Sequence, residues 1–200
     1  MNSVRLEILT GPALDAALPA LARLRIKVFR DWPYLYDGDL AYEEAYLQRY
    51  RNSKDAIVVG AFDGDRLVGA STGTPLVDHA EDFAVAFAGS EIDLNTVFYC
   101  AESVLLPAYR GLGLGHGFFD AREGYAHDRG YLLSAFCSVL RSQSHPMREK
   151  AYAPLDPFWR KRGYAPLQGI VAQFSWKDIG SSCATDKPLQ FWARDLPPPS

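Results

Sequence analysis

The sequence predicts a single domain of the α/β class built on a mixed sheet, and three observations support that prediction. The chain has 200 residues, and one domain usually contains about 100–200. Strand-like and helix-like apolar periodicities alternate in the order β-α-α-β-β-β-α-β-α-β-β. Residues 96–140 read as strand, glycine-rich turn, helix and strand, a βαβ unit whose strands should be parallel neighbours. Residues 1–196 form the expected domain, and the proline-rich residues 197–200 an expected disordered tail.

Local signals place each element along the chain. Alternating apolar residues begin a first strand at Val4, and Gly11-Pro12 opens a helix because proline suits the first helical turn. The turn at residues 63–65, Asp-Gly-Asp, joins two strands into a hairpin. Residues 77–95 are ambiguous between helix and loop. The expected strands are 4–10, 56–62, 67–74, 96–106, 131–140, 169–176 and 189–194, and the expected helices are 11–28, 41–50, 117–129 and 158–162.

Composition limits the classes of partner and compartment. Lys and Arg number 21 against 24 Asp and Glu, a formal charge of −3, so electrostatic capture of nucleic acid is not expected. No apolar run reaches the ~18 residues of a membrane helix, and the N-terminus lacks the pattern of a signal peptide. The three cysteines form no CxxC pair, and the four histidines show no metal-ligand spacing. These features predict a cytoplasmic protein with no metal and with neither membrane nor nucleic-acid partners.

Glycines alternate in the turn that follows the strand at 96–106, from Gly111 to Gly117. Without Cβ atoms the backbone can approach a ligand closely, and the free N–H groups and dipole of a helix start favour a phosphate. The P-loop is excluded because no Lys-Ser or Lys-Thr follows, and GxGxxG is excluded because His116 and Phe118 occupy the sixth positions. The remaining pattern is Arg-x-x-Gly-x-Gly over residues 110–115, which predicts a site for a phosphate or pyrophosphate.

This pattern resembles the pyrophosphate loop of the GNAT superfamily, the acetyl-CoA-dependent N-acetyltransferases. The strand before that loop ends in a pattern like Val-x-Pro-x-Tyr, and here residues 104–109 read Val-Leu-Leu-Pro-Ala-Tyr. Residues 158–164, Phe-Trp-Arg-Lys-Arg-Gly-Tyr, are similar to the family's Phe-Tyr-Glu-Lys-x-Gly-Phe helix end. The strand order is also the family's order. The resemblance implies a GNAT-like acyltransferase fold, a mostly antiparallel sheet in which one parallel strand pair splays apart.

The resemblance also implies the acyl donor and where it binds. Acetyl-CoA would sit between the strands at 96–106 and 131–140, with main-chain groups pairing with the pantetheine arm and polarising the thioester carbonyl. Amides of the glycine turn would hold the pyrophosphate. The implied cofactor-binding residues are Ser103, Val104, Leu105, Arg110, Gly111, Leu112, Gly113, Leu114, Gly115 and His116.

The implied reaction is direct attack of a primary amine on the thioester in a ternary complex, and it suggests two catalytic residues. Glu102 is the one carboxylate in the strand at 96–106, so it is a candidate general base, with a structural ion pair as the alternative. The family's usual general acid is a tyrosine at the position of Trp159, and an indole cannot serve as an acid. Tyr152 is the substitute candidate, Cys137 and Tyr164 are weaker ones, and catalysis without a dedicated acid stays open.

Two segments are candidates for binding the acceptor amine. The loop at residues 30–40 carries Trp32, Tyr34 and Tyr36 among aspartates, which suits a cationic amine. The segment at 141–157 carries Arg141 and His145, which suit a carboxylate or phosphate on the acceptor. Because the two sets favour acceptors of opposite charge, the identity of the acceptor stays open. The sequence also leaves the preferred acyl chain open. The resemblance allows a homodimer, for which the sequence gives no interface signal.

Two other interpretations compete with an enzyme of this kind. A catalytically silent acyl-CoA-binding sensor or interaction domain of the same fold is supported by Trp159. A serine hydrolase is suggested by residues 69–73, Gly-Ala-Ser-Thr-Gly, which match GxSxG around Ser71. A nucleophile elbow needs a strand, a turn and a helix, whereas Ser71 lies inside the second strand of the expected hairpin. N-acetyl transfer is therefore the leading prediction.

Overall fold

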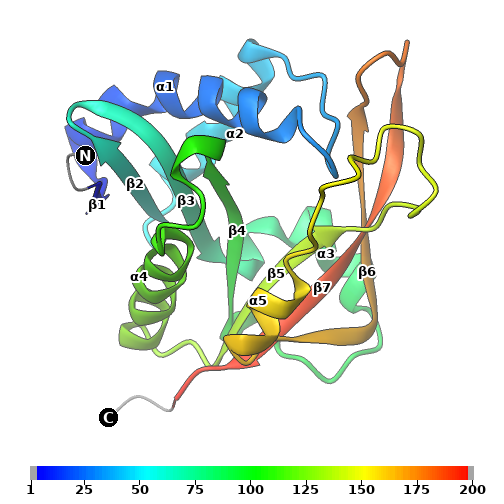
Figure 1. Ribbon diagram of the computed structural model, residues 1–200. Helices are drawn as coiled ribbons and strands as arrows, with labels where there is room; N and C mark the ends of the chain where they lie inside the picture. Colours follow the sequence, from blue (N-terminus) through cyan, green and yellow to red (C-terminus); the bar gives the residue numbers. More distant parts are fainter. Residues whose placement is uncertain (1–3, 198–200) are drawn as a thin grey trace.

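The computed structural model describes residues 4–197, and it contains a mixed seven-stranded sheet in the order β1-β2-β3-β4-β5-β7-β6 (Figure 1). Its strands are β1 (Arg5–Ile8), β2 (Ile57–Asp63), β3 (Arg66–Pro75), β4 (Val97–Leu105), β5 (Leu133–Val139), β6 (Ala165–Lys177) and β7 (Ala184–Asp195). Neighbouring strands are antiparallel except for β4 and β5, which are parallel as the βαβ unit requires. The predicted fold class and the predicted succession of strands along the chain are confirmed.

Five α-helices cover the two faces of this sheet. They are α1 (Gly11–Phe29), α2 (Leu40–Asn52), α3 (Ala80–Phe87), α4 (Leu114–Asp128) and α5 (Asp156–Lys161). Phe98 of β4 contacts Tyr125 of α4, and the next residue, Tyr99, contacts Phe83 of α3. Because successive residues of a strand point to opposite faces, α3 and α4 lie on opposite faces. None of the helices within residues 4–197 is long and apolar enough to cross a membrane.

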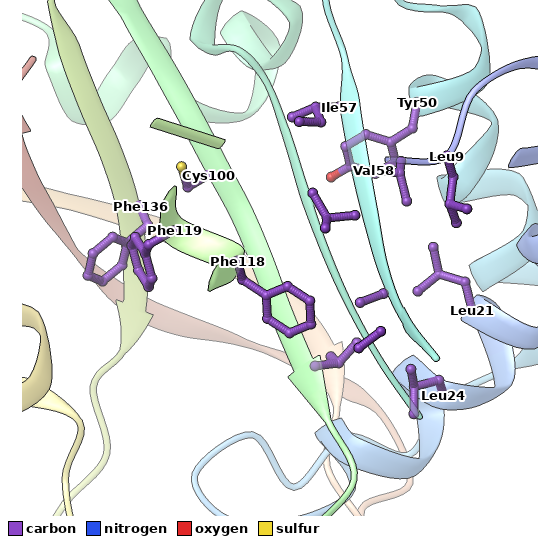
Figure 2. Packing of buried hydrophobic residues seen from close by; sticks show 14 of the residues in the cluster. Leu9, Leu21, Leu24, Tyr50, Ile57, Val58, Cys100, Phe118, Phe119 and Phe136 are labelled. Carbon is purple, nitrogen blue, oxygen red and sulfur yellow. The ribbon is translucent and has the colours of Figure 1, made fainter. Parts of the chain in front are cut away.

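Apolar side chains fill the space between the sheet and the helices. Figure 2 shows part of the larger core cluster, with Leu21 and Leu24 of α1 on one side of the strands and Phe118 of α4 on the other. A second cluster joins α3 to the strands β4, β5, β6 and β7, with Phe83 and Phe191 fully buried. Burying a large apolar side chain stabilises the fold by about 1.5–3 kcal/mol, so these two clusters fix the helices on the sheet.

Several boundaries differ from the sequence-based expectation, and one ambiguity is resolved. Strands β6 and β7 begin at Ala165 and Ala184 rather than at 169 and 189. Residues 80–87, within the ambiguous segment, form helix α3. Helix α4 begins at Leu114 rather than at 117, because Gly113, with φ 81°, adopts the left-handed conformation at its N-cap. Gly117 therefore lies inside the helix, where a Cβ atom would stand 2.4 Å from Leu6 of β1. Of the expected tail at 197–200, residues 198–200 lie outside the described part of the chain.

The parallel pair β4–β5 separates after three paired positions, the last being Tyr99 with Ala135. The register with β3 pairs Thr72 with Glu102 but Thr74 with Tyr99, so β4 carries one extra residue at this point. Such a β-bulge bends its strand and disrupts the local ladder. The bend directs β4 away from β5 and opens the sheet, as the resemblance implied.

Arg122 of α4 holds the bulge in place. The side chain is 1% exposed, and its Nη1 donates to the carbonyls of Glu102 at 2.9 Å and Thr72 at 3.2 Å. Its Nη2 donates to Ser103 Oγ at 2.9 Å. The guanidinium therefore satisfies main-chain carbonyls on both β3 and β4 at the point where the ladder is irregular.

Candidate active site

A cleft of about 880 Å³ occupies the opening between β4 and β5. Ser103 and Leu105 line it from β4, Phe136 and Cys137 line it from β5, and the glycine turn closes one end. Trp32 and Tyr152 line it from the two loops that the sequence suggested for acceptor binding. A hollow of this size lies in the range of sites for drug-sized ligands, about 300–1,000 Å³.

The glycine turn presents backbone and positive charge to this cleft. Gly111 and Gly113 have φ values of 78° and 81°, which L side chains rarely adopt, and no other atom lies within 4 Å of a Cβ built at either position. These glycines are therefore required by the backbone conformation and not by packing. The turn leads into the N-terminus of α4, where unpaired N–H groups and the helix dipole favour an anion. Arg110 is half-exposed beside them, and its Nη2 lies 3.6 Å from Asp31.

Seven of the ten predicted cofactor-binding residues line the cleft, namely Ser103, Leu105, Arg110, Gly111, Gly113, Gly115 and His116. Three do not: Val104 is buried in the core, Leu114 is buried at the start of α4, and Leu112 is exposed. The role predicted for these residues belongs to their main-chain groups, and it stays a prediction.

Glu102 lies in a buried ion network at the floor of the site. Its carboxylate is 2.5 Å from Nη1 of Arg25 on α1, and Arg25 is also ion-paired with Glu43 on α2. Tyr46 donates a hydrogen bond of 3.4 Å to the same carboxylate. Burial works to lower the pKa of Arg25, but Glu102, Tyr46 and Glu43 outweigh it and hold this pKa well above its usual value. Arg25 is therefore charged, and Glu102 takes part in the ion pair that the sequence left as one of two alternatives.

The residues considered as general acid differ in their surroundings. Trp159 packs against Phe136 and Trp192, with ring centroids 4.9 and 5.3 Å apart, and lines the cleft as a wall. Tyr152 also lines the cleft, and burial raises its pKa, with a further contribution from Asp156. Its hydroxyl therefore keeps its proton at neutral pH and can donate it.

The two weaker candidates are less suited to that role. Burial raises the pKa of Cys137 to about 12, but its thiol is already hydrogen-bonded to the hydroxyl of Tyr99 at 3.1 Å. Burial also raises the pKa of Tyr164, whose hydroxyl is already bonded to Ser134 at 2.7 Å and to Glu123 at 2.9 Å. Tyr152 is thus the tyrosine with the better access to the cleft.

Arg141 joins three segments of the chain. Its guanidinium makes a two-pronged ion pair with Asp178, 2.7 Å at each oxygen, and donates to the carbonyls of Pro33 and Tyr34 at 3.0 and 2.8 Å. These bonds fasten the loop at 30–40 to the end of β6. Neither Arg141 nor His145 lines the cleft, although the His145 ring lies 5.2 Å from that of Trp32. Their contact with an acceptor stays a prediction.

A second, smaller cavity of about 120 Å³ lies on the face of the sheet that carries α1, α2 and α3. Tyr34 and Tyr36 line it, as do Glu43, Tyr46 and Tyr99. Only the first two are candidates for acceptor binding from the sequence, because the others come from separate elements that the fold brings together. The spacing of four between Tyr42, Tyr46 and Tyr50 on α2 was the available signal, but it did not show what they face.

The cavity and the cleft meet at a small set of shared residues, namely Phe29, Tyr34, Ala101, Glu102 and Cys137. We call these five residues the junction. It lies beside the bulge of β4, where the strands separate. A ligand in the cleft and a second ligand in the cavity would therefore approach each other at Glu102.

The alternative chemistries require features that the described residues lack. Ser71 lies in the middle of β3, paired with Val59 and Ser103 and fully buried, so it does not occupy a strand–turn–helix elbow. Within residues 4–197 no group of three or more His, Cys, Asp or Glu side chains is placed to hold a metal ion. The glycine turn and the two hollows are thus the strongest functional features of the described chain.

Comparison with solved structures identifies the fold, whereas the sequence matches no protein-family model and no curated protein. A ribosomal-protein-alanine N-acetyltransferase from Brucella melitensis is 16% identical over 95% of this chain and 99% of that chain, with a TM-score of 0.60. An N-acetyltransferase from Staphylococcus aureus Mu50 is 10% identical over 96% and 99%, with a TM-score of 0.60. A GNAT superfamily phosphinothricin acetyltransferase from Sinorhizobium meliloti, in complex with acetyl-CoA, is 12% identical over 96% and 88%, with a TM-score of 0.61. The chain therefore has the fold of the GNAT acetyltransferases.

Proposed function

We propose that this protein is a GNAT-type N-acetyltransferase that moves an acetyl group from acetyl-CoA to a primary amine. The observation that carries the proposal is the position of the glycine turn and the α4 N-terminus at one end of the cleft between β4 and β5. A helix start that favours an anion and an open strand edge thus line one cleft, which suits a long ligand with a pyrophosphate. The structural likeness to an acetyltransferase in complex with acetyl-CoA also supports this donor.

In the proposed complex, amides from Gly111 to His116 hold the pyrophosphate, and Arg110 adds positive charge beside it. The pantetheine arm runs along β4 at Ser103 to Leu105, where the strand no longer pairs with β5. Unpaired main-chain groups at that edge can bond to the arm and to the thioester carbonyl. A backbone N–H at the thioester oxygen would stabilise the negative charge that develops there during attack.

The transfer itself is a direct displacement. The amine nitrogen attacks the carbonyl carbon, the C–N bond forms, the C–S bond breaks, and CoA leaves as the thiolate. The proton of the amine passes to Glu102, directly or through a water, and Tyr152 or solvent returns a proton to the thiolate. The balanced products are the acetamide and CoA with a free thiol. Glu102 suits the role of base because it stands at the junction of the cleft and the cavity.

A second candidate function is a silent acyl-CoA-binding domain of the same fold. Two observations favour it: Trp159 occupies the position of the family's tyrosine, and Glu102 is already ion-paired with Arg25. Such a domain would bind acetyl-CoA without transferring its acyl group.

The two functions are separated by measuring free thiol with acetyl-CoA and a broad pool of primary amines, and by mass spectrometry of the amines. The acetyltransferase predicts thiol release that requires both protein and amines, together with products heavier by one acetyl group. Binding of acetyl-CoA with no thiol release across the pool would instead establish the silent domain. Gly113→Glu serves as the variant in which both binding and release should fall.

A further inference from the structure

We propose that the acceptor is a small primary amine attached to an aromatic or apolar body and lacking a carboxylate. It would bind in the cavity of about 120 Å³ that adjoins the cleft. This inference rests on the proposed function and assigns the second substrate of the same site. Four properties of the cavity carry it: its connection to the cleft, its size, its apolar lining and its charge.

The connection fixes which end of the acceptor reacts. The cavity reaches the cleft at the junction, where Ala101, Glu102 and Cys137 line both hollows. An amine held in the cavity therefore meets a thioester in the cleft only through its end nearest Glu102. The part of the acceptor that the cavity holds lies between the sheet and the helices α1, α2 and α3.

The size excludes large acceptors from the cavity. An engineered apolar cavity of about 150 Å³ is known to bind benzene, so a hollow of similar volume accepts roughly one ring and a short side chain. A polypeptide segment or a second sugar-sized group would not fit. The described cavity is therefore matched to a small-molecule amine.

The lining favours an aromatic or apolar body. Phe83, Phe174 and Trp176 border the cavity together with five tyrosines. Many of these rings already pack edge-on against one another, for example Phe83 with Tyr99 at 4.9 Å between centroids. A further ring can extend this packing, and such aromatic pairs contribute about 0.5–1.5 kcal/mol beyond the area they bury.

The charge of the cavity favours a cation and opposes a carboxylate. Glu43 and Glu102 supply two negative charges, and Arg25 supplies one positive charge between them. Arg25 is already paired with both carboxylates, so among the described lining residues no free guanidinium or ammonium is left to receive an acid. Protonated amines also bind favourably over aromatic faces.

His79 adds a polar contact that the protein itself leaves unused. Its Nδ1 lies 2.7 Å from Nη1 of Arg49 and 3.4 Å from Oδ2 of Asp82. Arg49 is the nearer partner and can only donate, so we assign Nδ1 as the acceptor and the ring proton to Nε2. That Nε2 is buried and makes no hydrogen bond to any group of residues 4–197. Because His79 lines the cavity, a hydroxyl on the acceptor's ring is the kind of group that would satisfy this donor. Tyramine therefore combines the features that the cavity favours.

The test compares amines under saturating acetyl-CoA, with kcat/KM measured from thiol release. Tyramine should exceed tyrosine, which differs by the added carboxylate, by at least about tenfold, since burying a like charge costs more than ~1.4 kcal/mol. Tyramine should also exceed spermidine, which has the charge without the aromatic body, and a short peptide with a free N-terminal alanine. Equal or higher kcat/KM for tyrosine, spermidine or the peptide would overturn the inference.

Two variants locate the effect in the cavity. Glu43→Gln removes one negative charge, and it should reduce the ratio of tyramine to tyrosine, whereas Glu44→Gln, on the exposed neighbour, should not. Phe174→Leu removes a ring from the lining and should raise the KM for tyramine with little effect on stability. Its control is Gln173→Ala, on the exposed preceding residue of β6. Unchanged selectivity and unchanged KM in these variants would place the acceptor elsewhere.

Binding of acetyl-CoA is measured for every variant by thermal unfolding. A thermal shift with acetyl-CoA, combined with a preference for one of the other amines, overturns the acceptor class and leaves the proposed function standing. Absence of any shift overturns the proposed function, and the acceptor class with it.

Discussion

Arg25 of α1 and Glu102 of β4 form a buried ion pair at the point where β4 leaves β5. Glu43 of α2 is the second carboxylate on the same guanidinium. These ion pairs join helices α1 and α2 to the bulged strand β4. The side chain of Glu102 lines both the cleft and the smaller cavity. One side chain thus belongs both to the packing of the fold and to the proposed chemistry.

Replacing Glu102 by Gln should separate these two roles. Loss of a general base typically lowers turnover by about 10²–10⁴-fold, so kcat should fall strongly while the affinity for acetyl-CoA stays within about twofold. Steady-state thiol release and a binding titration measure the two quantities. Full activity of Glu102→Gln would limit Glu102 to its structural ion pair.

Replacing Gly113 by Glu should weaken acetyl-CoA binding by at least tenfold. The substitution puts a negative charge beside the proposed pyrophosphate and a Cβ at a φ of 81°. Gly180, with a φ of 79° and equally open surroundings in the turn between β6 and β7, provides the matched control. Both variants should lose about 1–2 kcal/mol of stability from the left-handed backbone, but only Gly113→Glu should lose affinity. Equal affinity in the two variants would remove the glycine turn from the cofactor site.

Arg122→Met should destabilise the protein by about 3 kcal/mol, because it leaves buried carbonyls of β3 and β4 without a donor. Urea denaturation measures the change. Arg23→Met, on the exposed side of α1, is the control and should change stability by less than about 0.5 kcal/mol. A loss no larger than that of the control would mean that the bulge of β4 does not depend on Arg122.

Asp178 should give the stability a specific pH dependence. Burial works to raise the pKa of Asp178, but Arg141 and Lys187 outweigh it and hold this pKa below its ordinary value. A carboxyl with a depressed folded-state pKa stabilises the fold above its unfolded-state pKa of about 3.9, and this contribution is lost as pH falls through the folded-state value.

Asp178→Asn should therefore be less stable than the parent by about 2 kcal/mol at pH 7. The difference should shrink steadily as the pH is lowered below about 5. Chemical denaturation across this range measures it. A difference that is independent of pH would show that the Asp178 charge is not what Arg141 binds.

The sequence predicted most of the scaffold, because the signals that define it are local. Gly11-Pro12, the turn at 63–65 and the alternating glycines each mark an element boundary within a few residues. The segment that forms helix α3 was ambiguous between helix and loop, because its eight residues make little more than two helical turns and show little periodicity. The start of α4 was misplaced because glycines at 115 and 117 suggest a turn, whereas close packing on Leu6 explains Gly117.

The chemistry of the site was less predictable, because it depends on partners that are distant in the sequence. Arg141 was a plausible anion-binding residue until the fold paired it with Asp178, 37 positions away. Glu102 could not be matched to Arg25, since charged residues are frequent and their pairing is set by tertiary structure. The cavity that holds the proposed acceptor draws on α1, α2, α3 and four strands, so no single segment reveals it.

Thermal unfolding with excess ligand shows directly whether the cleft beside the glycine turn binds acetyl-CoA. A ligand at about 100 times its Kd stabilises the folded state by about 2.7 kcal/mol. For a chain of this size, that corresponds to a rise in Tm of roughly 5–10 °C. We expect this rise in Tm with acetyl-CoA and not with NADH or ATP. An unchanged Tm at millimolar acetyl-CoA would contradict it.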